Sequence, residues 1–161
     1  MITNIYTIGV YNSTEDSFFD KLKSNNIELF CDIRLRRGVR GAQYKYVNKT
    51  YLESKLTSLG VQYLHIKELA PTKEIRQKQK DADKLNKETK KQRGALGKDF
   101  IVAYCNRILN PFDMHKLIAR IESMGVERIA FFCVEEQAQA CHRSLVAKQM
   151  GSLLNVEVED L

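Results

Sequence analysis

Short runs of apolar and β-branched residues recur along the chain, and each is about the length of a buried strand. They lie at residues 5–8, 27–31, 61–65, 128–133 and 156–158. The segments between them repeat their apolar residues with the period of a helix, as Phe18, Phe19 and Leu22 do. This alternation predicts an α/β fold, a three-layer sandwich in which helices cover both faces of a mainly parallel sheet.

Capping residues and helix breakers suggest where the helices begin. Asn48 or Thr50 is placed to cap a helix that turns Tyr51 inward. Pro111 is expected in the first turn of a later helix, because its missing N–H costs nothing there. The apolar stretch 100–109 favours a helix over a strand, because its apolar residues continue beyond the length of a strand.

The composition shifts between residues 73 and 98, where Lys, Gln, Glu and Asp replace most apolar residues. Thr72 is placed to cap a helix at the start of this stretch. We interpret the stretch as a charged insertion, either a solvated helix or a mobile segment. It would belong to a single α/β domain that spans residues 1–161.

Whole-chain composition indicates the class of protein. The chain has 161 residues, of which 43% are hydrophobic and 29% charged, as in an ordinary globular domain. Neither a signal sequence nor a membrane span is visible, so we expect a cytoplasmic protein with no membrane partner and with reduced cysteines. The net charge of +6 favours an anionic partner, such as a nucleotide or nucleic acid, although many basic proteins bind neither.

Polar residues follow several of the predicted strands. These strand-end residues are Gly9, Asp32, Arg34, His65, Cys133 and Glu135. Ligands bind beyond the carboxyl ends of parallel strands, so we expect these residues to gather at one site. Asp32 and Arg34 occupy alternate positions and therefore point the same way, where they can bind each other or a ligand.

The triplet Cys141-His142-Arg143 opens a predicted helix and is the sharpest chemical signal. A helix N-terminus favours a thiolate, and His142 and Arg143 can lower the pKa of the thiol and hold an anion beside it. We predict Cys141 or Cys133 as the catalytic thiol and Glu135 or His142 as the proton carrier. Alternatively, Cys141 packs as a small apolar residue and Glu135 only anchors an arginine such as Arg143.

Arginines also crowd a glycine-containing loop after the second strand. Arg36, Arg37 and Arg40 would repel one another unless an anion neutralises them, which suggests that this loop binds phosphate. Tyr44 and Tyr46 are placed to stack on a base or a sugar. The alternative is a solvated basic loop on which Tyr44 packs.

A metal centre is the weaker interpretation of the thiols. Cys133, Cys141 and His142 can supply three zinc ligands, with Cys105 as a fourth. Their spacing lacks the close Cys-x-x-Cys pairs that are typical of structural zinc sites, so we predict no metal and no cofactor.

Several short motifs, taken together, resemble a known family. In chain order they are Thr7-Ile8-Gly9, Asp32-Ile33-Arg34, Tyr63-Leu64-His65, Glu68-Leu69-Ala70-Pro71-Thr72, Cys133-Val134-Glu135 and Cys141-His142-Arg143. They resemble the bacterial and archaeal family called domain of unknown function 488, a likeness that extends to the final strand. The resemblance implies a small α/β protein and leaves its reaction open. The fold is also weakly similar to rhodaneses, but the loop before Arg143 carries two glutamates and no glycine, unlike a compact anion cradle.

Three functions are compatible with these residues. The leading hypothesis is an enzyme that acts on a phosphate-bearing ligand, a nucleotide or nucleic acid, with a cysteine and acid–base site. One alternative is a non-catalytic module that binds nucleic acid or protein through the arginine loop and the lysine-rich stretch. The other is a thiol redox or sulfur-transfer protein. Thiol reactivity across pH separates them, since a thiol that reacts well below its usual pKa of about 8.5 indicates chemistry.

Overall fold

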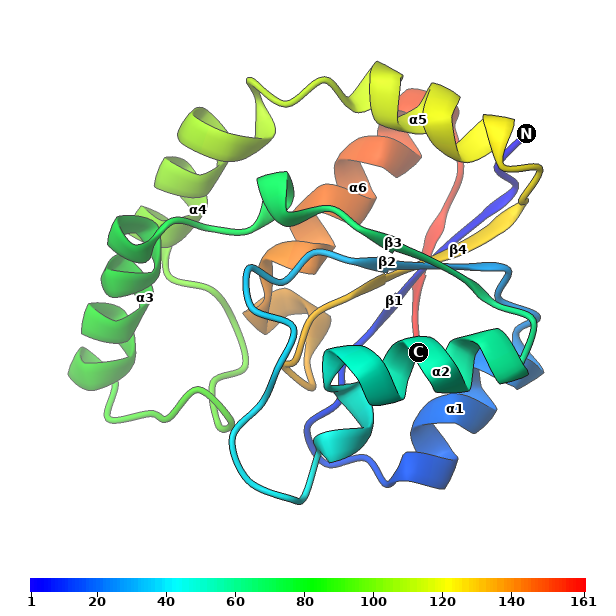
Figure 1. The fold of residues 1–161 in the computed structure, drawn as a ribbon. Coiled ribbons are helices and arrows are strands. Elements are labelled where there is room, and N and C mark those ends of the chain that lie inside the picture. Colours follow the sequence, from blue (N-terminus) through cyan, green and yellow to red (C-terminus); the bar gives the residue numbers. More distant parts are fainter.

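A five-stranded, all-parallel sheet forms the middle layer of the protein in the computed structural model, which describes residues 1–161 (Figure 1). The strands are β1 (Asn4–Ile8), β2 (Leu29–Asp32), β3 (Gln62–His65), β4 (Arg128–Phe132) and β5 (Val158–Asp160). Their order is β3-β2-β4-β1-β5, so β4 is central. Each strand predicted from the sequence occurs within a residue or two of its expected place, and the predicted parallel sheet is confirmed.

Helices lie on both faces of the sheet and complete a three-layer α/β fold. The helices α1 (Glu15–Ser24) and α2 (Lys49–Ser58) cover one face, and α5 (Met114–Ser123) and α6 (His142–Leu154) cover the other (Figure 1). The two remaining helices, α3 (Lys73–Leu85) and α4 (Lys98–Tyr104), lie beyond the carboxyl ends of the strands. No helix is both long and apolar enough to cross a membrane.

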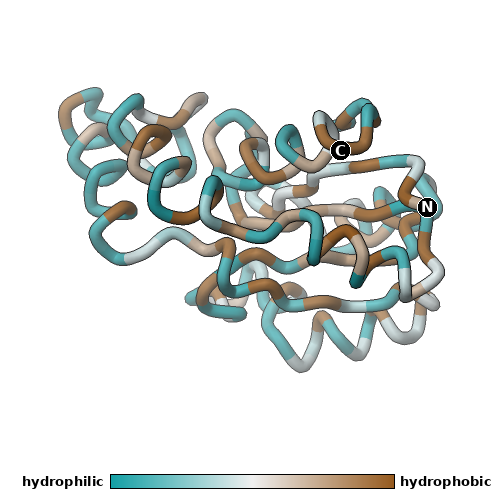
Figure 2. The backbone as a smooth tube through the Cα atoms, turned by 90° about the horizontal axis from the view of Figure 1, so that it is seen from above, coloured by the Kyte–Doolittle hydropathy of each residue, from teal (hydrophilic) through white to brown (hydrophobic).

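The hydrophobic core surrounds the central strand. Ile129, Ala130, Phe131 and Phe132 of β4 are all fully buried, and Phe18 of α1 packs edge-on against Phe132 at 5.6 Å between ring centroids. Hydrophobic residues follow the strands through the middle of the molecule, and hydrophilic residues are frequent on the outer turns of the helices (Figure 2). This rigid layer fixes the positions of the strand ends, where the polar residues stand.

Two of the predicted helix details are wrong. Tyr51 does not turn inward: its side chain is 41% exposed and its hydroxyl donates to Glu15. Pro111 lies outside its helix, which begins at Met114 because Asp113 supplies a better cap, with its carboxylate accepting from the N–H of Lys116 at 2.9 Å. The stretch 100–109 is helical, as predicted, and ends in a π-helical turn over Cys105–Leu109.

The charged stretch after β3 begins as a helix and returns to the sheet edge. Thr72 caps α3 as predicted, with its hydroxyl accepting from the N–H of Ile75 at 3.2 Å. One face of α3 is buried through Ile75, Gln79 and Asp83. Residues 86–97, here called the strap, then run back across the carboxyl ends of the strands and reach the loop after β4, where the N–H of Leu96 donates to the carbonyl of Gln139.

Candidate functional site

A cavity of about 560 Å³ opens at the carboxyl ends of the strands. Its walls come from the segments that follow β1, β2, β3 and β4, including α3 and the strap. The chain leaves β1 toward α1 on one face of the sheet and leaves the adjacent β4 toward α6 on the other face. Such a divergence opens a crevice at the sheet edge, which is the place where open α/β sheets bind ligands. Of the predicted strand-end residues, Arg34, Cys133 and Glu135 line this cavity, whereas Gly9, Asp32 and His65 do not.

Two thiols and an imidazole lie together in the wall of this cavity. Cys133 follows β4 directly, Cys141 is the N-cap residue of α6, and His142 is the first residue of that helix. All three are buried, and their ligating atoms lie within 4.8 Å of one another. We call these residues the thiol–imidazole cluster. The strand and the helix bring together residues that are separated by a loop in the sequence.

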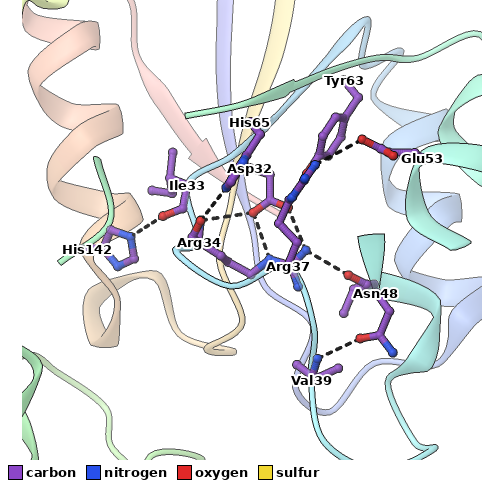
Figure 3. Close-up of polar contacts among 11 residues, drawn as sticks. Asp32, Ile33, Arg34, Arg37, Val39, Asn48, Glu53, Tyr63, His65 and His142 are labelled. Carbon is purple, nitrogen blue, oxygen red and sulfur yellow. Dashed lines mark hydrogen bonds and ion pairs between the residues drawn. The ribbon is translucent and has the colours of Figure 1, made fainter. Parts of the chain in front are cut away.

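The orientation of His142 is fixed by a backbone carbonyl. Its Nε2 lies 3.1 Å from the carbonyl oxygen of Ile33, which can only accept, so Nε2 carries the hydrogen (Figure 3). In the neutral ring Nδ1 then holds the lone pair, and it lies 3.7 Å from Sγ of Cys141. The ring is therefore set to accept a proton from the thiol or to bind an electrophile beside it.

Cys133 is held in its neutral form. A hydrogen bond with Cys141 and then its own burial raise the pKa of the Cys133 thiol well above its ordinary value. Of the two predicted catalytic thiols, Cys133 is therefore the poorer nucleophile at neutral pH, because the thiolate is the reactive form. Cys141, at the N-terminus of α6, is the better candidate.

Glu135 is a buried carboxylate that pairs with the strap. Its Oε1 lies 2.8 Å from Nη2 of Arg93 and 3.5 Å from Nζ of Lys90. Burial alone would raise the pKa of Glu135, but the positive charges of Lys90 and Arg93 outweigh it and lower the pKa to about 2. A carboxylate this acidic is a weak general base, so the geometry favours the anchoring role. The anchored arginine is Arg93, whereas Arg143 contacts only the backbone carbonyl of Glu135.

Asp32 and Arg34 bind each other, as the alternate spacing allowed. Nε and Nη2 of Arg34 donate to the two carboxylate oxygens of Asp32 at 2.9 and 2.7 Å, and the hydroxyl of Tyr63 donates to Asp32 at 2.8 Å (Figure 3). Nε2 of His65 lies 2.7 Å from the carbonyl oxygen of Arg34 and supports the same turn. Arg34 is 5% exposed, and its remaining nitrogen Nη1 is buried with no partner.

Four of the predicted ligand-binding residues lie outside the cavity wall. They are Asp32, Arg37, His65 and Arg143. Arg37 pairs with Glu53 of α2, with 3.3 Å between Nη1 and Oε1. Asp32 and His65 act through the position of Arg34, as described above.

Arg143 stabilises the loop after β4 from beneath. Its side chain is 1% exposed and donates to the hydroxyl of Thr7 at 3.2 Å and to the backbone carbonyls of Glu135 and Glu136. Gly9 permits this approach, because a Cβ at that position would lie 1.9 Å from the carbonyl oxygen of Glu135. The first two residues of the predicted triplet thus face the cavity and the third holds the loop.

The arginine loop supplies the outer wall of the cavity. Arg36 and Arg40 line it with exposed side chains, and neither pairs with a carboxylate. Tyr44 also lines the cavity but is 4% exposed and packs against Tyr11, with ring centroids 5.4 Å apart. Tyr46 is buried in the core against Phe18 and Phe19, so its predicted role in stacking on a ligand is wrong.

Sequence analysis missed the wall that α3 and the strap provide. Arg93 donates to Asp83 and Glu135 at 2.8 Å each, and Asp83 accepts from Gln79 at 2.7 Å. Lys90 and Lys91 complete this side of the cavity. Gln79 and Asp83 lie one helical turn apart, and this pair could have indicated a buried polar face. In a highly charged stretch, however, such a face cannot be distinguished from a solvated one.

Comparisons with known proteins place the chain in a family. Neither the curated proteins nor the solved structures give a match. The similarity to rhodaneses stays a prediction. A family model described as "Domain of unknown function DUF488" matches residues 14–150. The match spans the Asp32–Arg34 strand end and the whole thiol–imidazole cluster, and it confirms the family that the motifs resemble; Thr7-Ile8-Gly9 and the final strand lie outside the matched residues. The chain belongs to the DUF488 family.

Proposed function

We propose that the protein is an enzyme that acts on a phosphate-bearing ligand, such as a nucleotide or the end of a nucleic acid. The ligand would occupy the cavity at the carboxyl ends of the strands, and the thiol–imidazole cluster would supply the reacting groups, with Glu135 anchoring the strap beside it. The volume of about 560 Å³ falls in the range of small-molecule sites.

The observation that carries this proposal is the unpaired nitrogen of Arg34. A buried donor without a partner is costly, and native proteins keep few of them. Nη1 of Arg34 is such a donor, in a residue that lines the cavity and whose other nitrogens are fixed by Asp32 and Val47. A phosphate oxygen in the cavity would accept its hydrogen bond and gain a charge-assisted contact.

The charge of the walls supports an anion over a neutral ligand. Five cationic side chains line the cavity with no carboxylate in ion-pair distance. They are Arg36, Arg40, Arg76, Lys80 and Lys91. Only two carboxylates line the same cavity, Asp83 and Glu135, and both already pair with Arg93. The excess positive charge in a partly enclosed space attracts polyanions such as di- and triphosphates.

The position of the cluster supports a reaction over simple binding. The lone pair on Nδ1 of His142 faces the Cys141 thiol in a buried wall, and the orienting carbonyl of Ile33 holds it there. This is the arrangement of nucleophile, base and orienting group that catalytic sites use.

Equilibrium titration with inorganic pyrophosphate and with nucleotides tests the binding half of the proposal. Arg36→Gln and Arg40→Gln remove cavity cations, and each is expected to weaken binding by about tenfold or more, the worth of a hydrogen bond to a charged group. Arg37→Gln is the matched control, because Arg37 belongs to the same loop but lies outside the cavity wall. Equal losses in all three variants, or no binding to the wild-type chain, would refute the cavity as the site.

Turnover tests the catalytic half. Phosphorus NMR of a panel of nucleotides and phosphate esters would detect a reaction, and Cys141→Ser is expected to slow it by about 10²–10⁴-fold while binding is retained. Tight, salt-sensitive binding with no turnover on any substrate would instead favour the non-catalytic binding module.

A further inference from the structure

The thiol–imidazole cluster has the composition of a metal site. Its three ligating atoms lie within 4.8 Å of one another although the residues were predicted to have no metal role. We propose that Cys133, Cys141 and His142 bind one divalent metal ion, for which zinc is the best match, with a fourth coordination position open to the cavity. Thiolate and imidazole together are the ligands that zinc prefers among protein side chains.

The spacing of the ligands agrees with tetrahedral coordination. A zinc ion about 2.3 Å from sulfur and about 2.0–2.1 Å from nitrogen separates those two ligands by about 3.6 Å when the geometry is tetrahedral. Sγ of Cys141 and Nδ1 of His142 are 3.7 Å apart. Little movement is therefore needed to bring the two groups onto one ion.

The surroundings of His142 are those of a metal-binding histidine. Such residues donate their second ring N–H to a carbonyl or carboxylate, which fixes the ring and makes the free nitrogen a better ligand. Nε2 of His142 donates to Ile33 in this way (Figure 3), and Tyr104 packs edge-on against the ring at 5.5 Å. The nitrogen left free is the one that faces Cys141.

Glu135 gives a second and independent indication of an ion. The residue is 5% exposed, and its Oε2 is buried without a partner, although Oε1 is held by Arg93. The carboxylate lines the cavity together with the three ligands. A water on the open metal position would donate to Oε2 and satisfy it. Zinc sites with three protein ligands keep a fourth position for such a water, and an acceptor beside it orients the water.

With the ion bound, Cys141 and His142 would act as ligands instead of as nucleophile and base, and both thiols would release their protons on binding. A water on the open position would then be the nucleophile. A bound zinc ion would supply the usual lowering of the pKa of its water, to about 7, beside the phosphate-binding wall. The centre rests on the proposed function for its substrate. Metal binding can, however, be measured with no phosphate compound present, so the two proposals can fail separately.

Titration of the chelator-treated full chain with Co²⁺ tests the site, because tetrahedral cobalt thiolates absorb strongly in the visible and near ultraviolet. We expect one Co²⁺ to bind per chain and to give absorption bands in both the visible and the near ultraviolet. These bands should disappear when Zn²⁺ is added and displaces the cobalt. Cys141→Ser and His142→Asn are each expected to weaken metal binding at least as much as the roughly 10–100-fold loss that follows removal of an outer-shell partner. Cys105→Ser is the control, since this partly exposed thiol lies outside the cluster and should leave binding unchanged.

Three results would overturn the metal site: no cobalt–thiolate bands in the wild-type chain, bands in Cys141→Ser that form with unchanged intensity at the same Co²⁺ concentration, or bands that are lost in Cys105→Ser. Circular dichroism shows whether each variant is folded. If Cys141→Ser does not fold, X-ray absorption of the zinc-loaded wild-type chain decides instead. A first shell of two sulfurs and one nitrogen plus one light atom supports the centre, and a shell without sulfur refutes it.

Discussion

Arg93 ties the strap to the sheet, and its removal should destabilise the protein far more than its place in a charged stretch suggests. The side chain is 8% exposed and pairs with the buried carboxylates of Asp83 and Glu135 at 2.8 Å each, while its Nε donates to the carbonyl of Ala140 at 3.1 Å. The variant Arg93→Met keeps an unbranched apolar stem and deletes all three polar contacts.

The expected loss of unfolding free energy depends on the polar partners that Asp83 and Glu135 retain in the variant. Removing one partner of a buried ion pair costs about 3–5 kcal/mol, because a charge is left uncompensated. Asp83 retains a hydrogen bond from Gln79, and Glu135 retains Lys90, whose exposed side chain is screened by solvent. We therefore expect the lower end of that range, about 3 kcal/mol, against a total stability of about 5–15 kcal/mol for a typical domain.

Urea unfolding followed by circular dichroism measures this loss. With a typical slope of about 2 kcal/mol per molar urea, the midpoint of Arg93→Met should fall by about 1.5 M. Arg107→Met is the matched control, because it breaks an ion pair to Glu74 in which both side chains are largely exposed and which is worth about 0–1 kcal/mol. A midpoint shift for Arg93→Met no larger than that of Arg107→Met would refute a strap anchored by buried charge.

Three further predictions concern the residues that build the site. Gly9→Ala should destabilise the chain by about 3 kcal/mol, because the carbonyl of Glu135 must move, and a normal melting temperature would contradict that contact. Asp32→Asn should cost about 3–5 kcal/mol in urea unfolding, since it leaves the buried guanidinium of Arg34 without its counter-charge, and a loss below 1 kcal/mol would sink this account. The pKa of Glu28 lies below its usual value because its carboxylate accepts from two backbone N–H groups. Its stabilising effect is therefore complete above a pH of about 4.5 and is lost as the pH falls through the lowered pKa. Glu28→Gln should reduce the dependence of the unfolding free energy on pH in this acid range, and an unchanged dependence would contradict the account.

The fold was readable from the sequence because its information is local and periodic. Strands such as Arg128–Phe132 are short apolar runs, and Thr72 caps α3 through an interaction three residues away. The parallel order of the strands then placed Cys133 at the same edge as Asp32 without further information. The predicted burial of Tyr51 was wrong because tyrosine, with an apolar ring and a polar hydroxyl, suits either the buried or the exposed face of a helix.

The far wall of the site was not readable, because it depends on contacts across many residues. Arg93 and Glu135 are separated by 42 residues in the chain, and the sequence around either residue does not indicate the other as its partner. Buried polar pairs have the same local composition as solvated ones, so only the folded chain shows that Gln79 and Asp83 face inward. The roles within Cys141-His142-Arg143 were likewise set by direction and not by residue type.

The position of Arg143 has a consequence for genetic screens of this protein. If the proposed activity holds, substitutions at Cys141 and at Arg143 would both abolish it. The first removes a group from the cavity, and the second releases the backbone of Glu135 and Glu136. A map of inactive variants would show one continuous motif, although one of these substitutions removes a functional group and the other destabilises the loop after β4. Soluble protein level separates them: a Cys141 variant should accumulate in cells as an inert protein, and an Arg143 variant should be degraded.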